Sequence, residues 1–422
     1  MSGPKQEQGG TGWGAGASSG AEAALLRRYP GFRSLMERAK RRSPRFAFDY
    51  LEGGVGDELC IDRNRRALDA VEIVPRYGID VAEVSPAASL FGRAYAMPLG
   101  ISPMGLAGLV WPNADDAMAA AAQKAGIPFV LSMVANTDIE TIARIAPGVV
   151  WLQLYAVPQD DYRVTLDMVD RGSRAGAHAL VLTLDTPTRQ KRLRDLRNGL
   201  TVPFRPTWRT VYDVARAPAW ALSTLRNGQP RFANFVPYVK DRARPGDVAG
   251  YVDRHMAGAM TWELIKRIRD RWPGPLVLKG IQHADDAEHA AGLGIDGIII
   301  SNHGGRQFDA APAAIDMVQD MKRRVGGRVS VMLDGSVHSG LDILRSLACG
   351  ADFVFAGRPF LAATAALGAG GPAHLARMFQ AELKGVMAQA GATDIAACGT
   401  LSFRMGRSQE FSQSHTRLCR QR

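Results

Sequence analysis

The stretch GIIISNHGGRQFD, residues 297–309, places a histidine and an arginine directly after a short apolar run. His303 is a candidate general base, because imidazole changes its charge near neutral pH. Asp185 ends another apolar run and could fix the tautomer of that histidine and stabilise its imidazolium form. Two arginines near one base, Arg192 and Arg306, indicate bidentate capture of a substrate carboxylate. The alternatives are a satisfied core histidine and a solvated basic face.

Further polar and glycine residues stand where other apolar runs end. Lys279 is one of them, and a buried ammonium is costly unless it meets an anion such as an electron-rich cofactor ring. The segments DGSVHSG (334–340) and AGRPF (356–360) could bind phosphate, because glycines let backbone N–H groups approach an anion and Arg358 adds charge. For either segment alone, simple chain reversal is the alternative. The other residues at run ends are Ser102, Pro103, Met104, Gly105, Ser132, Gln153, Tyr155, Thr183 and Ser301.

These residues need a scaffold that brings their run ends to one face. Eight short apolar runs are separated by helix-length segments such as 115–126, 137–146, 285–294 and 339–350. Apolar strands that alternate with helices predict a parallel sheet, and eight such units predict an α/β fold of the (β/α)8 TIM barrel type. An open doubly wound sheet is the alternative, but its typical GxGxxG turn does not follow the first run. The predicted strands are 97–102, 129–133, 149–155, 179–185, 276–280, 297–301, 329–334 and 353–357.

Residues 188–260 interrupt this repeat. They are too many for an ordinary loop, so we expect an insertion after the fourth strand, on the active-site face of the barrel. Between Thr186 and Pro245 there are thirteen lysines and arginines against three acids, which is nearly the whole net charge of +11. A charge excess confined to one element argues against a nucleic-acid binder. The predicted domains are a flexible Gly/Ser-rich tail at 1–24, the barrel with its insertion at 25–395, and a C-terminal tail at 396–422.

The composition is that of a soluble globular protein, with 46% hydrophobic and 22% charged residues. No apolar run is long enough to span a bilayer as a helix. Four cysteines without a CxxC pair favour a reduced cytosolic setting and argue against a zinc site, so we expect no metal. Residues 1–20 lack the basic and apolar regions of a signal peptide. These features predict a cytoplasmic protein.

Several motifs resemble those of the FMN-dependent 2-hydroxy-acid dehydrogenase and oxidase family. SNHGGRQFD is similar to the family signature SNHGGRQLD, with Phe308 for the usual leucine, and the resemblance extends over residues 25–395. Other shared segments are FDYLEGG (48–54), LQLY (152–155), LTLDTP (182–187), LVLKG (276–280) and AGRP (356–359). Within the family, MGLAGLVWP (104–112) and RFANFV (231–236) resemble the branch of (S)-mandelate dehydrogenase and bacterial L-lactate dehydrogenase, and the mandelate enzyme in particular.

The resemblance implies FMN as the cofactor and assigns roles to individual residues. The catalytic set would be His303 as the base, Asp185 as its orienting partner, Tyr155 and Tyr50. The substrate carboxylate and hydroxyl group would be contacted by Tyr50, Tyr155, Arg192 and Arg306. FMN would be held by Pro103, Met104, Gly105, Ser132, Gln153, Thr183, Lys279, Ser301, Asp334, Gly335, Ser336, Gly357 and Arg358.

The implied reaction is oxidation of an (S)-2-hydroxy acid, mandelate-like or lactate-like, to the 2-oxo acid, with electrons passing from FMN to a quinone-like acceptor. Gly105 stands where dehydrogenases of the family tend to have glycine and oxidases alanine. The alternatives are an oxygen-using oxidase that makes peroxide, an FMN-dependent isomerase on a similar barrel, and a non-catalytic basic binding protein. Whether His303 takes the Cα proton or the hydroxyl proton stays open. The family resemblance also implies a homo-oligomer, namely a tetramer.

The basic insertion suits an interfacial membrane anchor near a quinone pool. Residues 205–240 combine positive charge with the aromatic side chains of Trp208, Trp220, Phe232 and Phe235. The protein would then lie peripherally on the inner face of the cell membrane. A soluble, arginine-rich lid is the alternative.

Four positions depart from the family pattern. His338 stands where many members have a phosphate-binding arginine, and Val134 stands where glycolate oxidase has a pocket tryptophan, which predicts a roomier pocket. Met104 replaces a smaller residue beside the flavin. The effects of Met104 and of Phe308 do not follow from the sequence.

Overall fold

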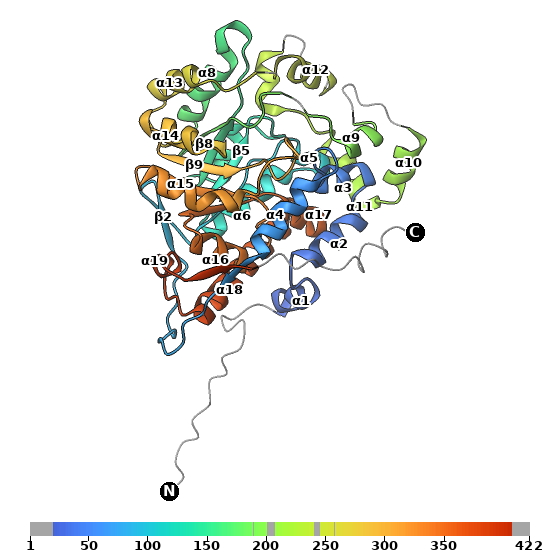
Figure 1. Cartoon of the computed structure of the whole chain (residues 1–422). Helices are drawn as coiled ribbons and strands as arrows, with labels where there is room; N and C mark the ends of the chain where they lie inside the picture. Colours follow the sequence, from blue (N-terminus) through green and yellow to red (C-terminus); the bar gives the residue numbers. More distant parts are fainter. Residues whose placement is uncertain (1–19, 189, 201–206, 240–244, 257, 407–422) are drawn as a thin grey trace.

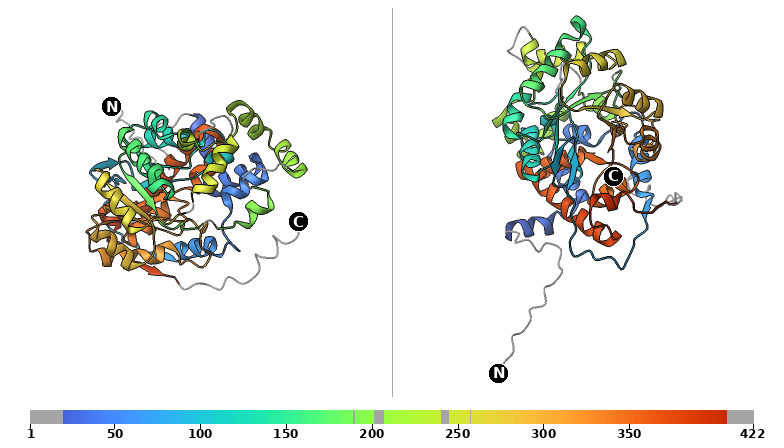
Figure 2. Two further views of the ribbon diagram at one scale, coloured as in Figure 1. Left: turned by 90° about the horizontal axis from the view of Figure 1, so that it is seen from above. Right: turned by 90° about the vertical axis from the view of Figure 1, so that its left-hand side faces the viewer.

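Eight parallel strands close into a barrel at the centre of the molecule (Figures 1 and 2). The structure, a computed structural model, describes residues 20–188, 190–200, 207–239, 245–256 and 258–406. Each barrel strand coincides with one of the eight apolar runs, so the predicted (β/α)8 barrel is confirmed. The strands are β4 (Leu99–Ile101), β5 (Phe129–Ser132), β6 (Val150–Leu154), β7 (Leu180–Thr183), β8 (Leu276–Ile281), β9 (Gly297–Ser301), β10 (Ser330–Asp334) and β11 (Phe353–Ala356).

The pairing register brings the predicted site residues together at the carboxyl ends of these strands. Thr183 lies opposite Lys279, and Ser301 lies opposite Asp334. Since all eight strands run in the same direction, their carboxyl ends form one rim, which is where barrel enzymes place their active sites. Below that rim the barrel is filled by a packed core that includes Val130, Trp151, Val181, Val277, Ile299, Met332, Phe353 and Phe355.

Helices form the outer layer and cover the apolar outer face of the strands (Figure 2). Side chains of Asp138, Thr261 and Ser339 accept backbone hydrogen bonds and begin three of these helices. The outer helices are α6 (Ala114–Ala125), α7 (Ile139–Ile145), α8 (Gln159–Arg174), α13 (Trp262–Arg271), α14 (Ala284–Gly292), α15 (Val318–Val325), α16 (Gly340–Ala348) and α17 (Arg358–Leu367).

Segments before and after the barrel pack beside each other. The N-terminal helices are α1 (Gly20–Arg28), α2 (Phe32–Arg42), α3 (Arg45–Glu52) and α4 (Leu59–Asp69), and α2 packs against α17. The other elements outside the barrel repeat are the strands β1 (Val71–Ile73), β2 (Ala88–Leu90), β3 (Arg93–Tyr95) and β12 (Phe403–Met405), the helices α5 (Ala107–Val110), α18 (Gly371–Ala390) and α19 (Ile395–Cys398), and the 3-10 turns η2 (Ala314–Met317) and η3 (Gly368–Gly370).

Helices and strands extend beyond both predicted boundaries of the barrel domain, into each predicted tail. Helix α1 already begins at Gly20, inside the predicted tail of 1–24. Strand β12, inside the predicted tail of 396–422, pairs antiparallel with β1 and completes a two-stranded sheet. The remaining parts of the two predicted tails, 1–19 and 407–422, lie outside the described residues.

The predicted insertion at 188–260 is largely helical and is attached to the barrel. Its elements are α9 (Leu193–Arg197), α10 (Trp208–Ala215), α11 (Pro218–Asn227), η1 (Ala233–Tyr238) and α12 (Pro245–His255). The indole N–H of Trp220 donates to the Leu109 carbonyl at 3.1 Å, and the Ala233 N–H donates to the Ala135 carbonyl at 3.1 Å. In the described parts of the chain, no helix is both long enough and apolar enough to cross a membrane.

Candidate active site

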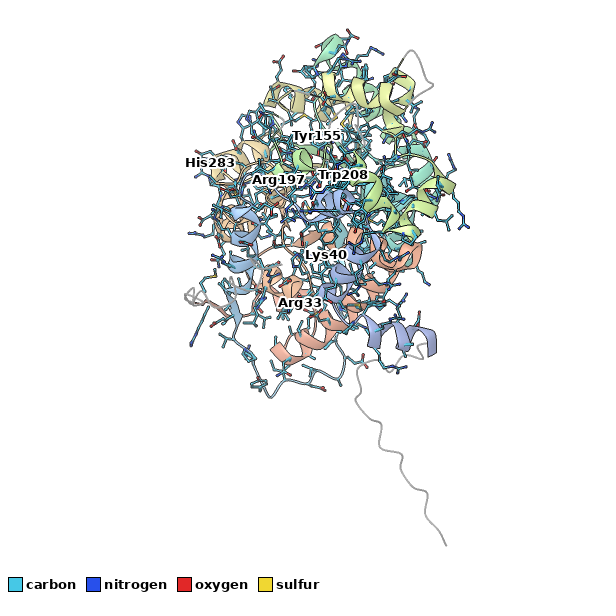
Figure 3. All side chains as sticks on the ribbon, turned by 90° about the vertical axis from the view of Figure 1, so that its right-hand side faces the viewer. Arg33, Lys40, Tyr155, Arg197, Trp208 and His283 are labelled. Atoms are coloured by element: carbon cyan, nitrogen blue, oxygen red, sulfur yellow. The ribbon has the colours of Figure 1, made fainter. Side chains whose placement is uncertain are left out.

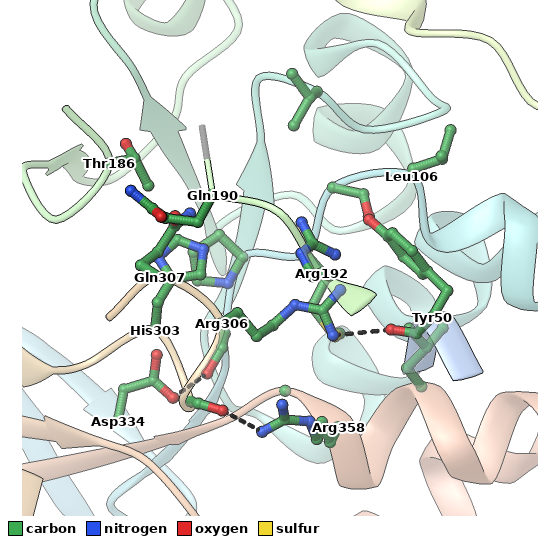
Figure 4. A pocket seen from close by; sticks show the side chains of 18 of the residues that line it. Tyr50, Leu106, Thr186, Gln190, Arg192, His303, Arg306, Gln307, Asp334 and Arg358 are labelled. Carbon is green, nitrogen blue, oxygen red and sulfur yellow. Dashed lines mark hydrogen bonds between the residues drawn. The ribbon is translucent and has the colours of Figure 1, made fainter. Parts of the chain in front are cut away.

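A cavity of about 580 Å³ opens at the carboxyl ends of the barrel strands (Figure 4). Loops that follow the strands line one side of it, with His303 and Arg306 from the loop after β9. The insertion forms much of another side. The apolar residues of the insertion that line the cavity are Leu196, Leu200, Phe232, Val252 and Met256.

The candidate base and its carboxylate partner come from two different strand ends and meet at this cavity. His303 Nδ1 lies 2.9 Å from Oδ1 of Asp185. Burial alone would raise the pKa of Asp185, but its interaction with His303, which includes the hydrogen bond, and the charge of Lys279 hold that pKa below its ordinary value. An ionised carboxylate only accepts hydrogen bonds, so Nδ1 carries the proton and Nε2 remains as the basic nitrogen. This is the arrangement of a histidine that can abstract a proton.

The loop that carries the base has an unusual backbone. His303, Gly304 and Gly305 have φ angles of 57°, 63° and 75°, in the left-handed region. The His303 N–H donates to Ser301 Oγ at 3.0 Å, which holds the non-glycine member of the series in place. A Cβ at Gly304 would lie 2.7 Å from Nη1 of Arg358, whose guanidinium donates to the Gly304 carbonyl. Glycine at 304 therefore lets this arginine pass directly against the base loop.

The two predicted carboxylate-binding arginines lie next to each other beside one tyrosine ring (Figure 4). The guanidinium carbons of Arg192 and Arg306 are 5.4 Å and 4.9 Å from the ring centre of Tyr50. Burial, and then the charge of Arg192, lower the pKa of Arg306 to about 9. Arg192 Nη1 lies 3.2 Å from Oδ2 of Asp195, so one carboxylate faces two cations. The pair therefore has one positive charge left for an anionic ligand.

The predicted tyrosines both line the cavity. The Tyr50 hydroxyl donates to the carbonyl of Gly105 at 2.9 Å. Burial, followed by the negative charge of Asp185, raises the pKa of Tyr155. Tyr155 therefore stays a neutral phenol, which can donate a hydrogen bond to a ligand.

A polar network crosses the inner end of the cavity. Lys279 Nζ lies 2.9 Å from Ser301 Oγ and 2.8 Å from Asp334 Oδ2. Burial would lower the pKa of Lys279, but Asp334 and then Asp185 raise it above its ordinary value, so the side chain is a cation. The anion expected near this lysine is thus at least partly supplied by Asp334.

A second hydrogen-bonded chain links three neighbouring strand ends. Ser132 Oγ donates to Gln153 Oε1 at 2.8 Å, and Gln153 Nε2 donates to Thr183 Oγ1 at 3.0 Å. All three side chains are buried. The predicted cofactor residues that line the cavity are Pro103, Met104, Gly105, Lys279, Asp334, Gly335, Ser336, Gly357 and Arg358, whereas Ser132, Gln153, Thr183 and Ser301 are buried and do not line it.

Comparisons with known proteins agree with this geometry. A model of the FMN-dependent dehydrogenase family matches residues 39–404. The chain belongs to this family. It is 36% identical over 356 residues to the (S)-mandelate dehydrogenase of Pseudomonas putida, which covers 84% of this chain and 89% of that enzyme. It is 37% identical over 356 residues to the L-lactate dehydrogenase of Caulobacter sp. (strain K31), with 84% and 93% covered.

Solved structures of two kinds resemble this FMN-dependent dehydrogenase. The monotopic membrane protein (S)-mandelate dehydrogenase matches with a TM-score of 0.83 at 35% identity, covering 89% of this chain and 99% of that one. A mandelate oxidase with (S)-4-hydroxymandelic acid matches with a TM-score of 0.77 at 34% identity, covering 90% and 99%. The predicted family, cofactor and enzyme class are confirmed: the protein is an FMN-dependent oxidoreductase of the 2-hydroxy-acid dehydrogenase and oxidase family.

The groups at the inner end of the cavity fit FMN. The hydroxyl and amide groups of Ser132, Gln153 and Thr183 do not line the cavity but are buried at the neighbouring strand ends, with Thr183 opposite Lys279, and they offer donors and acceptors that a flavin ring edge can use. The cationic Lys279 suits a ring that gains negative charge on reduction. At the far end, Arg358 is half-buried, and its burial, together with the charge of Arg192, lowers its pKa to about 10. It donates to the carbonyls of Gly304 and Gly53 while it lines the cavity.

The structure corrects the predicted distribution of aromatic residues in the insertion. Trp208 is 82% exposed, but Trp220 and Phe235 are buried, and Phe232 lines the cavity. Three of the four proposed anchor aromatics therefore face the protein. Their sequence pattern is amphipathic, as an anchor requires, but the same pattern also suits a helix that packs against a barrel.

Sequence reasoning did not identify several residues that shape the site. Asp195 shares the arginine pair, and Arg65 donates to the Ser336 carbonyl at 2.8 Å and to both oxygens of Asp342. Phe32, from α2, packs on the ring of His338. None of these residues stands at a strand end, so the barrel pattern held no signal for them.

Two of the four departures receive a structural account. A Cβ on Gly105 would lie 2.6 Å from Cγ2 of Val134, so these two residues form one packed unit on the cavity wall. Phe308 is 66% exposed and is not among the cavity-lining residues, so its bulk points away from the site.

Proposed function

We propose that this FMN-dependent enzyme oxidises an (S)-2-hydroxy acid with a bulky apolar side chain to the 2-oxo acid, with His303 as the base. The single observation that carries the proposal is the meeting of an oriented histidine with a pair of arginines in one cavity. A 2-hydroxy acid needs both elements, because its carboxylate must be bound and a proton must be removed next to it.

The substrate carboxylate binds Arg192 and Arg306. Within the described residues these two guanidinium groups share one carboxylate, Asp195, and Arg306 is partly withdrawn from solvent at the cavity, so an anion gains more there than in water. The neutral hydroxyl of Tyr155 adds a hydrogen bond to the carboxylate or to the hydroxyl group of the substrate.

Proton removal falls to Nε2 of His303. Nδ1 is engaged by Asp185, which also stabilises the imidazolium once the proton has been accepted. FMN, when bound, supplies the acceptor for the two electrons that leave the substrate carbon.

The apolar wall of the cavity supports a substrate with a large side chain. Leu106 and Val134 line it from the barrel loops, and Leu200, Phe232 and Met256 line it from the insertion. Burial of apolar surface contributes about 25 cal/mol for each Å². An aromatic or branched side chain would therefore bind better here than the hydrogen of glycolate.

The proposed electron acceptor is a quinone reached at a membrane surface. Helices α10 and α11 expose a group of apolar side chains, which we call the apolar helix pair: Trp208, Val211, Tyr212, Leu222 and Leu225. Figure 3 shows the side of the molecule from which Trp208 projects. A solved relative is a monotopic membrane protein, which supports peripheral attachment of this chain, as proposed for the inner face of the cell membrane.

An oxygen-using oxidase is the second candidate, because mandelate oxidases are among the similar structures. The packing of Val134 on Gly105 favours the dehydrogenase, since this wall leaves no space for the alanine of the oxidases without a shift. A homo-oligomeric state remains a prediction that sedimentation of the full-length protein would test.

The decisive experiment is anaerobic bleaching of the flavin by single 2-hydroxy acids. We expect (S)-mandelate and branched 2-hydroxy acids to reduce the flavin faster than lactate, and lactate faster than glycolate. Reduced enzyme is then mixed with either air-saturated buffer or a soluble quinone. Fast peroxide formation in air would support the oxidase instead, and no bleaching by any of these acids would contradict the proposed function.

A further inference from the structure

The loop at 334–338 carries a histidine, His338, whose ring makes no hydrogen bond to any residue that the structure describes. His338 lines the cavity beside Asp334, Gly335 and Ser336. Its backbone N–H donates to Asp342 Oδ2 at 2.9 Å, so the position of the residue is fixed. Across the described ranges, neither ring nitrogen has a hydrogen-bond partner, although most buried polar groups in proteins do.

A second residue holds this ring in place. Phe32, the first residue of α2, lies with its ring centre 4.3 Å from that of His338, and the two planes are inclined by 32°. Helix α2 packs along α17, which begins at Arg358. The orientation of the imidazole is therefore set by packing, and its nitrogens remain available to the cavity.

The nearby cations differ in how far they are neutralised. Lys279 is paired with Asp334, and Arg65 is paired with Asp342 and Asp69. Within the described residues, Arg358 donates only to backbone carbonyls and forms no ion pair. A phosphate at this end of the cavity would thus meet one unpaired guanidinium, which leaves several of its oxygens in need of donors.

The imidazole of His338 can supply one hydrogen-bond donor to such a phosphate without adding a positive charge to that of Arg358. Burial, and then the charge of Arg65, lower the pKa of His338 to about 4. The ring is therefore neutral at neutral pH, with one N–H group that donates and one nitrogen that accepts.

We propose that His338 binds the phosphate group of FMN through a hydrogen bond from its ring, with Phe32 as the residue that positions this ring. Arg358 supplies the charge at the same end of the cavity. The inference goes beyond the proposed function, because it concerns how the cofactor is held and not which acid is oxidised.

The test compares FMN with riboflavin, which has the same ring system but no phosphate. Full-length protein is stripped of flavin and titrated with either compound while flavin fluorescence is measured. We expect His338→Leu to weaken FMN binding about ten- to a hundredfold, the effect of losing one hydrogen bond to a charged group, and to leave riboflavin binding unchanged. His338→Gln, which keeps an N–H donor, should lose less, and Phe32→Leu should weaken FMN binding and spare riboflavin.

A matched control is His178→Leu. Like His338, His178 is half-buried, but it lies before β7, at the opposite end of the barrel, where it packs against Trp151. This variant should bind FMN like the wild type. Unchanged FMN affinity in folded His338→Leu protein, or equal weakening of FMN and riboflavin, would overturn the phosphate role. Failure of the wild type to bind FMN would instead contradict the proposed function.

Discussion

His303 and Asp185 form one hydrogen-bonded unit across two strand ends, with 2.9 Å between Nδ1 and Oδ1. The second carboxylate oxygen, Asp185 Oδ2, is buried and has no hydrogen-bond partner among the described residues. The carboxylate thus concentrates its interaction on the histidine, and this unit carries the proton-transfer chemistry proposed for the enzyme.

Replacing His303 by glutamine should stop the reaction without releasing the cofactor. We expect flavin reduction by a 2-hydroxy acid to fall by about two to four orders of magnitude, the usual contribution of a general base. Stopped-flow absorbance under anaerobic conditions measures the rate, and the flavin content of the purified protein is the control. Undiminished reduction in flavin-loaded protein would remove His303 as the base.

Replacing Asp185 by asparagine should slow flavin reduction while substrate binding is retained. The amide no longer stabilises the imidazolium, and it allows the ring to take the other tautomer. We expect a loss of about two orders of magnitude or more in the rate at saturating substrate, with little change in substrate Kd. A change confined to Kd would show that Asp185 acts on binding instead.

Arg192→Met should weaken substrate binding about ten- to a hundredfold, because a charge-assisted hydrogen bond to the carboxylate is lost. The Kd from flavin bleaching at increasing substrate concentration measures this. Arg194→Met is the matched control: Arg194 is two residues away, but its guanidinium is paired with Glu52 and Glu58. Equal effects of both variants would mean that Arg192 acts through the fold of the insertion.

Asp115 should make the stability of the protein depend on pH. It is buried, and its Oδ2 accepts from the Asn136 N–H at 2.8 Å. Burial raises its pKa from 3.8 to about 7. Between these values the folded protein keeps a proton that the unfolded chain has lost, so the free energy of unfolding falls as the pH rises through this window.

Asp115→Asn removes this titration and keeps an acceptor for the Asn136 N–H. From pH 5 to pH 8 the wild type should lose about 3 kcal/mol of free energy of unfolding relative to the variant, since this range contains about two units below the folded pKa and each unit corresponds to about 1.4 kcal/mol. Urea denaturation at both values measures the difference. A constant offset between variant and wild type would show that Asp115 does not titrate in this range.

The apolar helix pair should govern attachment to lipid vesicles. Trp208→Ser combined with Leu225→Ser removes its two most exposed apolar side chains and should reduce co-sedimentation with vesicles about tenfold or more. Turnover with a soluble quinone should persist. Tyr77→Ser is the control, because Tyr77 is 74% exposed but lies outside the insertion. These substitutions are cleaner than deletion of residues 205–240, which would also remove Phe232 and Phe235.

The barrel could be predicted because its strands are buried on both faces, which leaves continuous apolar runs such as Gly297–Ser301 in the sequence. The pairing of His303 with Asp185 followed from the same pattern, since both residues stand where runs end. The contacts that the predicted residues make with distant parts of the chain could not be predicted in this way. Phe32 reaches His338 only through the packing of α2 on α17, a contact between residues some three hundred positions apart.

The insertion shows the limit of local patterns most clearly. Trp208 and Trp220 both lie in short helices with apolar and basic residues, yet one is 82% and the other 7% exposed. Which of them faces solvent is decided by the barrel surface, since the indole N–H of Trp220 finds its acceptor on Leu109. No periodicity within the insertion encodes that acceptor.

The side chain of Asn136 connects the loop after β5 with two other segments. It accepts from the Gly108 N–H at 2.6 Å and donates to the Arg231 carbonyl at 2.9 Å, next to the cavity residue Phe232. Arg231 follows closely after Asn227, the last residue of α11, which belongs to the apolar helix pair. If the apolar helix pair attaches to lipid as proposed, a shift of that pair would be transmitted through Asn136 to the wall of the substrate cavity, so that membrane attachment and substrate binding would be mechanically coupled.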